Sequence, residues 1–255
     1  MITIKSEADF DKMAVAGRVV AKVLEEVRGA AAPGISMQDL DALAARVIEE
    51  AGCRPSFLGY RGYPARICTS PNEVIVHGIP GRSRLREGDI LSVDAGAIYE
   101  GLHADAAITF PIGEIAPEVE KLLRVTEEAL WAAIALVKAG SRLGDLGHAV
   151  QTVAEGAGFS VVREYVGHGI GRLMHEEPQI PNYGEPGSGM KLRTGMAVCL
   201  EPMVNVGGWE TRLLGDNWTV VTADGSLSAH FEHTIALRAD GPHVLTVFEQ
   251  RELAH

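Results

Sequence analysis

The stretch ILSVDAGAIYEGLHADAAITF, residues 90–110, contains two apolar, β-branched runs separated by a Tyr-Glu-Gly turn signal. The pattern predicts a β-hairpin within a buried sheet. With the loop centred on residues 99–100, Asp94 would lie directly opposite Asp105, with Cβ atoms roughly 4.5–5.5 Å apart. A three-residue loop with Gly101 in a bulge would shift this pairing by one residue and keep the acids neighbours. Two solvated strand aspartates are the alternative, but opposed acids in a buried sheet indicate a bound cation.

Elsewhere the chain repeats one order of elements, two helices followed by several short strands. Helical spacing of apolar residues, with Ser6, Ser36 and Ser141 as expected N-caps, predicts four helices. We expect them over residues 6–29, 36–52, 117–137 and 141–158. Gly17 lies on the apolar face of the first helix and disfavours it by roughly 1 kcal/mol relative to alanine. Short β-branched runs predict strands over residues 67–69, 74–76, 90–93, 106–110, 159–166, 197–200, 218–222 and 230–237.

This repeat of organisation, with no linker inside it, predicts one domain of mixed α/β class. Its two halves would cover approximately residues 1–115 and 116–255 around a common sheet core. The 255 residues, of which 46% are hydrophobic, are enough for one large domain with a substantial core. The 29 glycines indicate many tight turns and argue against a helical bundle.

The charge of the chain argues against some classes of partner. A formal net charge of −11 and a pI near 5.3 disfavour stable binding to nucleic acid or to an anionic membrane. Arg82, Arg84 and Arg86 form a local basic run, which we expect to be a solvated loop. Transient contact of this run with RNA on a ribosome is the alternative.

The three cysteines, Cys53, Cys68 and Cys199, are an odd number without a C-x-x-C pair, so neither a disulfide framework nor a thiolate zinc site is expected. No apolar run is long enough to span a bilayer, and residues 1–10 lack the apolar region of a signal peptide. A reducing cytoplasm is therefore the expected compartment.

Two histidines lie in a glycine-rich stretch, VGHGIGRLMHEEP at residues 166–178. The glycines disfavour a helix and let the backbone approach a ligand closely. On a helix, His168 and His175 would be roughly 10–11 Å apart, too far to share one metal. We therefore expect one histidine to be a metal ligand and the other to contact a substrate.

Two glutamates complete the candidate site. Glu201 follows the apolar run 196–200, and Glu232 lies inside a strand-like run. A charged side chain at the end of a buried strand is unfavourable unless it is paired or bound to a metal. Ion pairs with Arg212 or Arg238 are the alternative for each.

Together, four carboxylates and one imidazole form a hard, oxygen-rich ligand set. Four carboxylates in one place raise their own pKa values unless cations lie between them, and two divalent ions would balance their charge. The set suits Mn(II), Fe(II) or Co(II) at least as well as Zn(II). Two ions held about 3.5–4 Å apart would generate a nucleophile from a shared water or hydroxide and polarise a carbonyl, so the expected reaction is hydrolysis.

The motifs resemble those of one family, the type I methionine aminopeptidases. They occur in family order and spacing and cover most of the chain after the first helices. The matching stretches are GYRGYP (59–64), NEVIVHGIP (72–80), residues 94–105, GHGIG (167–171), HEEP (175–178), EP (201–202) and FEHT (231–234).

The resemblance implies a pita-bread fold, with pseudo-symmetric halves around an antiparallel sheet core flanked by helices, and removal of the initiator methionine from nascent chains with small second residues. It assigns as metal ligands Asp94, Asp105, His168, Glu201 and Glu232. By the same matching, Asp105 and Glu232 bridge two ions, and a bridging water or hydroxide attacks the scissile carbonyl. Glu201 would also carry protons to and from this water.

The resemblance also implies roles around the scissile bond. His175 would contact the substrate carbonyl and stabilise the tetrahedral intermediate, and His77 would position the scissile amide or the leaving amine. The free α-amine of the substrate would meet the metal held by Asp94, which explains an exopeptidase. The implied substrate-binding residues are Phe57, Tyr60, Tyr63, Cys68, His77, Met174, His175 and Trp218.

Two pocket residues depart from the family pattern. Phe57 stands where the family often has cysteine, and Met174 where it often has phenylalanine. Both are apolar, so we expect a reshaped but working pocket for a thioether. The family also has a monovalent cation site, for Na or K, which here resembles Asn72, Val74 and Ser228.

Two other interpretations compete with this one. The proline-specific peptidases of the same fold, aminopeptidase P and prolidase, share the metal set, and cleavage of X-Pro peptides would distinguish them. A pita-bread protein that has lost catalysis and acts as a binding module is the other, and absence of bound metal would favour it. The resemblance further implies a monomer, with nascent-chain N-termini as partners and at most transient ribosome contact.

Overall fold

The computed structural model describes residues 2–247, and its four α-helices start and end close to the predicted positions. They are α1 (Glu7–Ala30), α2 (Met37–Glu50), α3 (Pro117–Ile134) and α4 (Leu143–Gly156), with a short 3-10 helix, η1 (Tyr60–Gly62). Ser6 and Ser36 cap the first two helices through capping boxes with Asp9 and Asp39, as predicted. No helix within residues 2–247 is both long and apolar enough to cross a membrane.

The predicted cap of α4 is wrong by one residue. Arg142 is the N-cap, and its backbone N–H donates to the Asp145 carboxylate at 3.2 Å. Ser141 instead donates its hydroxyl to the Leu136 carbonyl, at the end of the preceding turn. The acid three residues after position 142, rather than the hydroxyl at 141, marks this helix start.

Gly17 has a structural reason to be glycine. A Cβ atom built at this position would lie 2.2 Å from the carbonyl oxygen of Leu245, closer than any real contact. Helix α1 therefore approaches the backbone of residue 245 at a point where only glycine fits.

The strands are mostly short and all of their pairings are antiparallel in the described part of the chain. They are β1 (Arg54–Pro55), β2 (Ile67–Pro71), β3 (Val74–Val76), β4 (Ile90–Tyr99), β5 (Leu102–Pro111), β6 (Ser160–Val161), β7 (Gly167–Gly169), β8 (Glu176–Ile180), β9 (Ala197–Leu200), β10 (Met203–Asn205), β11 (Thr211–Leu213), β12 (Val220–Thr222), β13 (Ser228–His230), β14 (His233–Arg238) and β15 (Gly241–Val244). The run predicted over 159–166 contains only the two residues of β6, and the run over 230–237 is divided between β13 and β14.

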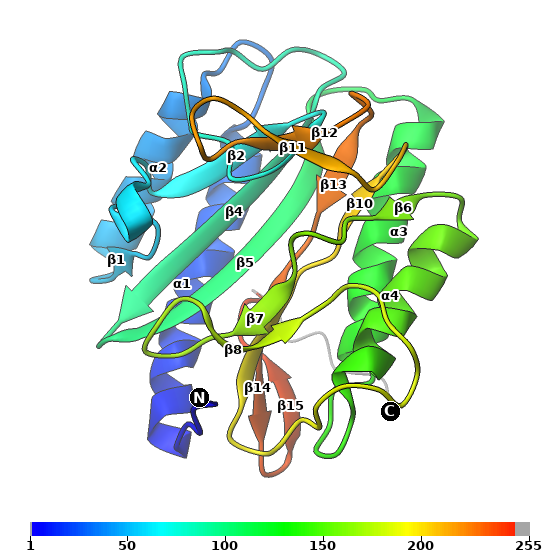
Figure 1. Cartoon of the computed structure of the whole chain (residues 1–255). Helices are drawn as coiled ribbons and strands as arrows, with labels where there is room; N and C mark the ends of the chain where they lie inside the picture. The colour runs from blue at the N-terminus through cyan, green and yellow to red at the C-terminus, as the bar shows by residue number, and fades with distance from the viewer. Residues whose placement is uncertain (1, 248–255) are drawn as a thin grey trace.

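Two larger sheets form the centre of the molecule (Figure 1). In the first, β4 pairs with β5 along one edge and with β1 and β2 along the other. The second has the order β15-β14-β9-β7-β8. Two smaller sheets, β13-β10-β6 and β11-β12-β3, complete the strands.

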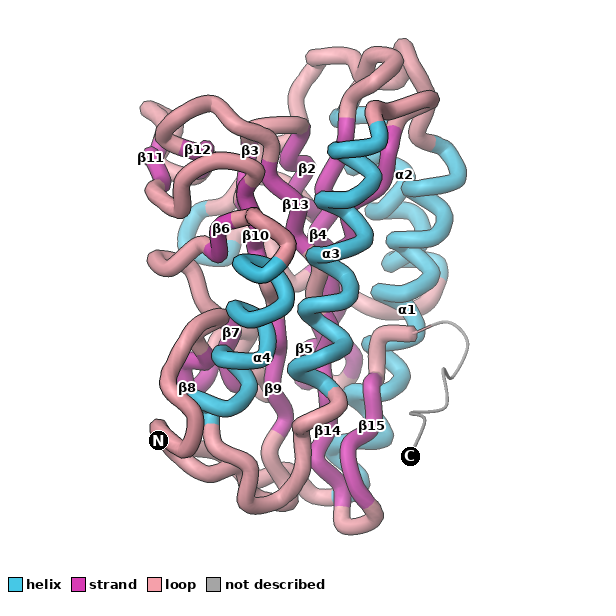
Figure 2. Tube along the Cα trace, turned by 90° about the vertical axis from the view of Figure 1, so that its right-hand side faces the viewer, coloured by secondary structure: helices cyan, strands magenta, loops and turns pink. Residues whose placement is uncertain are grey.

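Each helix pair packs on its own set of strands. Buried side chains of α1 and α2 form one hydrophobic cluster with β2, β4 and β5, and those of α3 and α4 form another with β9, β10, β13 and β14. Figure 2 shows the two pairs beside one another, with β7 and β8 on the side away from α1 and α2. We propose that these layers correspond to the predicted halves, divided near residue 115, of one domain.

The β4–β5 hairpin differs from the predicted register. Its loop is Glu100-Gly101, both with positive φ (46° and 82°), and Tyr99 pairs with Leu102. Two left-handed residues form the type of turn that joins twisted strands, which moves the loop one residue towards the C-terminus. The prediction of directly opposed aspartates is therefore wrong: Asp94 pairs with Ala107, and Asp105 pairs with Gly96. The two acids are diagonal neighbours on one face of the sheet.

Candidate metal centre and active site

The two larger sheets meet along β5, and this seam positions the candidate site. Glu232 donates its backbone N–H to the Ala107 carbonyl at 2.8 Å, and the Ala107 N–H donates back at 3.3 Å. The Thr234 hydroxyl accepts from the Asp105 N–H at 2.9 Å and donates to the Asp105 carbonyl at 2.8 Å. Asp105 on β5 and Glu232, directly before β14, are therefore held side by side.

The structure brings the five predicted metal ligands together at this seam. Carboxylate oxygens of Asp94, Asp105 and Glu232 all lie within 4.8 Å of one another. Glu201, directly after β9, places Oε1 3.5 Å from Nε2 of His168 on β7. Two ligands thus come from the first half of the chain and three from the second.

Burial raises the pKa of all four carboxyl groups in the candidate site. Burial raises the pKa of Asp94 to about 7 and raises those of Asp105, Glu201 and Glu232 well above their usual range. Mutual repulsion adds to this, since Glu232 and Asp94 raise the pKa of Asp105 further. Burial also lowers the pKa of His168 to about 3, so its imidazole is neutral at pH 7 and retains a lone pair.

The residues present fit a divalent cation. Asp94 Oδ1, Asp105 Oδ1 and Glu232 Oε1 are buried, and within residues 2–247 none of these three oxygens has a hydrogen-bond partner. Buried, unpaired carboxylate oxygens are unfavourable in a protein interior but are the donors that hard cations prefer. Arg238, the predicted alternative partner, pairs instead with Glu7 and Asp11. The other predicted arginine, at position 212, lies on β11 and is exposed.

His175 lies next to the candidate metal centre, supported by a tyrosine. Its ring centroid is 4.2 Å from that of His168, and the two come from β7 and the residue before β8, which confirms that they share no helix. The Tyr60 hydroxyl is 2.9 Å from His175 Nδ1, and the two rings stack at 5.3 Å. Burial lowers the pKa of His175, which favours the neutral ring.

A cavity of about 760 Å³ opens beside these groups. All five candidate ligands line one part of this cavity, and apolar side chains form another part of its wall. Phe57, Tyr63, Cys68 and Met174 are buried in one hydrophobic cluster, against which Tyr60 and Trp218 pack. The Tyr63 hydroxyl donates to the Gly78 carbonyl at 2.9 Å, which fixes its ring in the wall. The predicted substrate-binding residues all line this cavity.

His77 projects into the same cavity from a strained position. Its φ is +61°, a conformation that non-glycine residues rarely adopt and that is common at functional sites. Its ring meets Trp218 edge-on at 6.2 Å and Tyr165 at 5.8 Å. Burial lowers the pKa of His77 to about 4, so the ring is neutral at pH 7.

The residues expected to bind a monovalent cation lie outside this cavity. Asn72 has a positive φ of 55°, and its carbonyl accepts from the Ser228 N–H at 2.9 Å. Its side-chain oxygen accepts from the Ile90 N–H at 3.1 Å. Val74 starts β3, two residues after Asn72. The loop thus places Asn72 against Ser228.

Sequence reasoning missed four neighbours of the site. Thr3 and Lys5 both contact Glu176, next to His175. These contacts span 173 and 171 positions, and no local sequence pattern predicts them. His230 is buried with Nε2 4.0 Å from Glu201 Oε2. Cys199, on β9, pairs with His168, and its place two residues before Glu201 was a usable signal, because alternate strand residues share a face.

Comparison with known proteins identifies the family of this chain. The profile of Metallopeptidase family M24 matches residues 11–239. The chain belongs to metallopeptidase family M24. It is 49% identical to the methionine aminopeptidase of Clostridium acetobutylicum over 250 residues, 98% of this chain and 100% of that protein.

Solved M24 structures have the same fold. The crystal structure of methionine aminopeptidase from Thermotoga maritima superposes with a TM-score of 0.95 at 48% identity, covering 97% of this chain and 100% of that one. Prolidase from Pyrococcus furiosus matches with a TM-score of 0.79 at 20% identity, over 97% of this chain and 66% of its own. That second likeness shows the shared fold alone. The pita-bread architecture predicted from the motifs is thereby confirmed.

Proposed function

We propose that this M24 protein is a metal-dependent aminopeptidase that removes the N-terminal methionine from nascent polypeptides with small second residues. The observation that carries this proposal is the group of buried, unpaired carboxylate oxygens that opens directly onto an apolar cavity. The similarity to methionine aminopeptidases over nearly the full length of both chains supports it.

Two divalent ions would be held by Asp94, Asp105, His168, Glu201 and Glu232. Asp105 and Glu232, which the seam between the sheets holds side by side, would serve both ions. When bound, the ions would supply Lewis-acid polarisation of the carbonyl and lower the pKa of water. The oxygen-rich donors favour Mn(II) or Fe(II), with Co(II) and Zn(II) as alternatives.

His175 would stabilise the negative charge that develops on the carbonyl oxygen. If the Tyr60 hydroxyl donates to Nδ1 of His175, the ring proton is on Nε2, which can then donate to the substrate. A neutral ring with a fixed tautomer is the form that this role requires, and Tyr60 acts as the residue that orients it.

Glu201 would carry the proton between the attacking water and the leaving amine. Its carboxyl is buried, faces Asp94 and Asp105 and lies 3.5 Å from His168 Nε2, so it would lie next to the water that the ions activate. His77, neutral and held edge-on to Trp218, would position the scissile amide.

The apolar wall would select methionine. Phe57, Tyr63, Cys68, Met174 and Trp218 offer aromatic faces and soft atoms to a thioether. The free amine would lie towards Asp94, at the other end of the substrate residue, so that the enzyme acts only at a chain end.

We further propose a Na or K site at Asn72, Val74 and Ser228, where the Asn72 backbone turns with a positive φ. A cytoplasmic location is supported by three free, buried cysteines. We propose a monomer that meets nascent chains and contacts the ribosome at most transiently, since the net charge of −11 disfavours stable RNA binding.

The test is release of methionine from Met-Ala-Ser by chelator-stripped protein titrated with Mn(II), Co(II) and Zn(II). We expect activity only with added metal and none on the N-acetylated peptide. Cleavage of X-Pro peptides without methionine release would favour a proline-specific peptidase. Absence of both cleavage and metal binding would indicate a binding module and refute the proposal.

A further inference from the structure

The candidate metal centre contains one donor that the carboxylates and the imidazole leave unused, the thiol of Cys199. This residue pairs with His168 across β7 and β9 and with Thr234 across β9 and β14. Directly paired residues of neighbouring strands point to the same face of a sheet, as do residues two apart along one strand. The sulfur therefore lies on the face that presents His168 to the centre.

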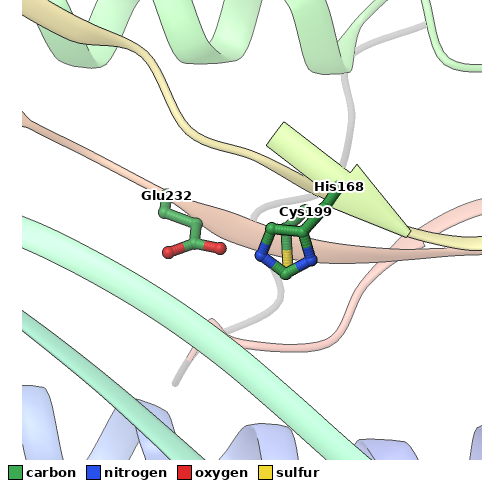
Figure 3. Close-up of side chains that lie close together, drawn as sticks. All are labelled: His168, Cys199 and Glu232. Atoms are coloured by element: carbon green, nitrogen blue, oxygen red, sulfur yellow. The ribbon is translucent and has the colours of Figure 1, made fainter. Parts of the chain in front are cut away.

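Figure 3 shows Cys199 with His168 and Glu232, whose side chains come from three adjacent strands or strand ends. One ligand atom from each residue lies within 4.8 Å of the other two. Bonds of about 2.0–2.3 Å to nitrogen, oxygen and sulfur place the ligand atoms of one zinc-sized ion within roughly 4.6 Å of each other. The upper limit of 4.8 Å on the three separations is thus close to the largest separation of ligands around a common ion.

The remaining contacts leave these donors available. Glu232 Oε1 is buried and accepts no hydrogen bond from any residue in the described range 2–247. His168 Nδ1 is 2.8 Å from the Gly169 carbonyl, to which it donates, so the lone pair is on Nε2. Cys199 Sγ has a long contact of 3.4 Å with the Thr234 hydroxyl, and its thiol also hydrogen-bonds with the Glu232 carboxylate, a contact that a bound cation would replace. An unpaired, buried carboxylate oxygen beside a thiol points to a cation rather than to packing alone.

We propose that the centre has a second binding mode, in which His168, Cys199 and Glu232 together hold one soft divalent cation. Thiolate sulfur prefers soft ions, whereas carboxylates prefer hard ones. Binding forms one metal–sulfur bond and releases the thiol proton to solvent. This mode shares His168 and Glu232 with the proposed catalytic arrangement, so a soft ion competes with the hard ions for the centre. The inference rests on the proposed metal binding and is independent of the peptide that is cleaved.

Cadmium is the probe, because a cadmium–thiolate bond absorbs in the ultraviolet and a cadmium bond to carboxylate or imidazole does not. Chelator-stripped wild type, Cys199→Ser and Cys199→Ala are titrated with Cd(II), and bound cadmium is counted by elemental analysis. We expect a thiolate band in the wild type that both Cys199 variants lose. Cys53→Ala and Cys68→Ala are matched controls, which remove the other two cysteines and should retain the band. Mn(II) binding and thermal unfolding of each variant establish that it is folded.

Each outcome decides a different point. Cadmium bound to wild type without a thiolate band, or a band that persists in both Cys199 variants, overturns the sulfur mode and leaves the proposed function intact. A band lost in Cys68→Ala assigns the sulfur to Cys68, which lines the cavity, and also overturns the proposal. A wild-type protein that binds neither Cd(II) nor Mn(II) overturns this inference together with the proposed function.

Discussion

Replacing Lys5 with methionine is expected to destabilise the protein by about 3–5 kcal/mol, the range for breaking a buried ion pair. Lys5 Nζ lies 2.8 Å from Glu176 Oε2, and the two side chains are only 6% and 4% exposed. Methionine keeps most of the apolar stem of lysine, so the loss comes from leaving Glu176 buried without its cation. Solvent screening, which weakens most ion pairs, is largely absent at this exposure.

Thermal unfolding at pH 7 measures the effect. For a protein of this size, 1 kcal/mol shifts Tm by roughly 2–4 °C, so Lys5→Met should lower Tm by roughly 6–20 °C. Lys12→Met is the matched control, because the pair of Lys12 with Glu100 has side chains 41% and 54% exposed. An exposed pair contributes about 0–1 kcal/mol, so the control should lose less than about 4 °C. Equal, small losses for the two variants would refute the reasoning from burial.

The effect of Lys5→Met should also depend on pH. Burial raises the pKa of Glu176, but hydrogen bonds from Lys5 and Thr3 outweigh it, and the net pKa is lowered from the ordinary value of 4.5. Because the folded pKa is the lower one, the stabilisation is present above about pH 4.5 and is lost as pH falls through the folded value. The Tm difference between wild type and Lys5→Met should therefore shrink below pH 4.5, and a constant difference would contradict this account.

Four further substitutions test other parts of the structure. Gly17→Ala should lower stability by about 1–3 kcal/mol in thermal unfolding, because its Cβ would meet a backbone oxygen at 2.2 Å. Gly29→Ala, with nothing within 4 Å of the added Cβ, should instead stabilise α1 by about 0.5–1 kcal/mol; destabilisation by both would contradict the steric argument. Tyr60→Phe keeps the stacked ring but removes the hydroxyl, so kcat for Met-Ala-Ser should fall about 10–100-fold at unchanged KM and manganese content. His175→Ala should lower kcat by roughly 10²–10³-fold, and a raised KM with equal kcat would assign His175 to ground-state binding.

Residue type and local spacing were enough to predict the helices and the grouping of the candidate ligands. Serine followed by an acid three residues later marks the starts of α1 and α2, because both partners of each capping box are local in sequence. The need for cations to balance the charge of four carboxylates predicted the candidate metal centre from the sequence. The same local rule, applied to Arg142 and Asp145, would have placed the start of α4 correctly.

Features that depend on conformation or on distant contacts could not be obtained in this way. The position of Asp94 relative to Asp105 required knowing that Glu100 adopts a left-handed conformation, which its residue type does not favour. The two-residue strand β6 exists because it pairs with β10, and the short strand β10 exists because it pairs with β13 as well as with β6. The contact between Lys5 and Glu176 spans 171 positions and has no local signal.

The seam between β5 and the residue pair Glu232–Thr234 has a consequence for how the protein folds. Neither half of the chain by itself contains the complete set of candidate ligands, and closing the seam requires the ordering of long intervening segments. A cation that binds only the closed seam would stabilise the folded chain by mass action and would have little affinity for a half-folded one. Metal uptake would then report the completion of folding, and catalytic competence would arise in a single late step.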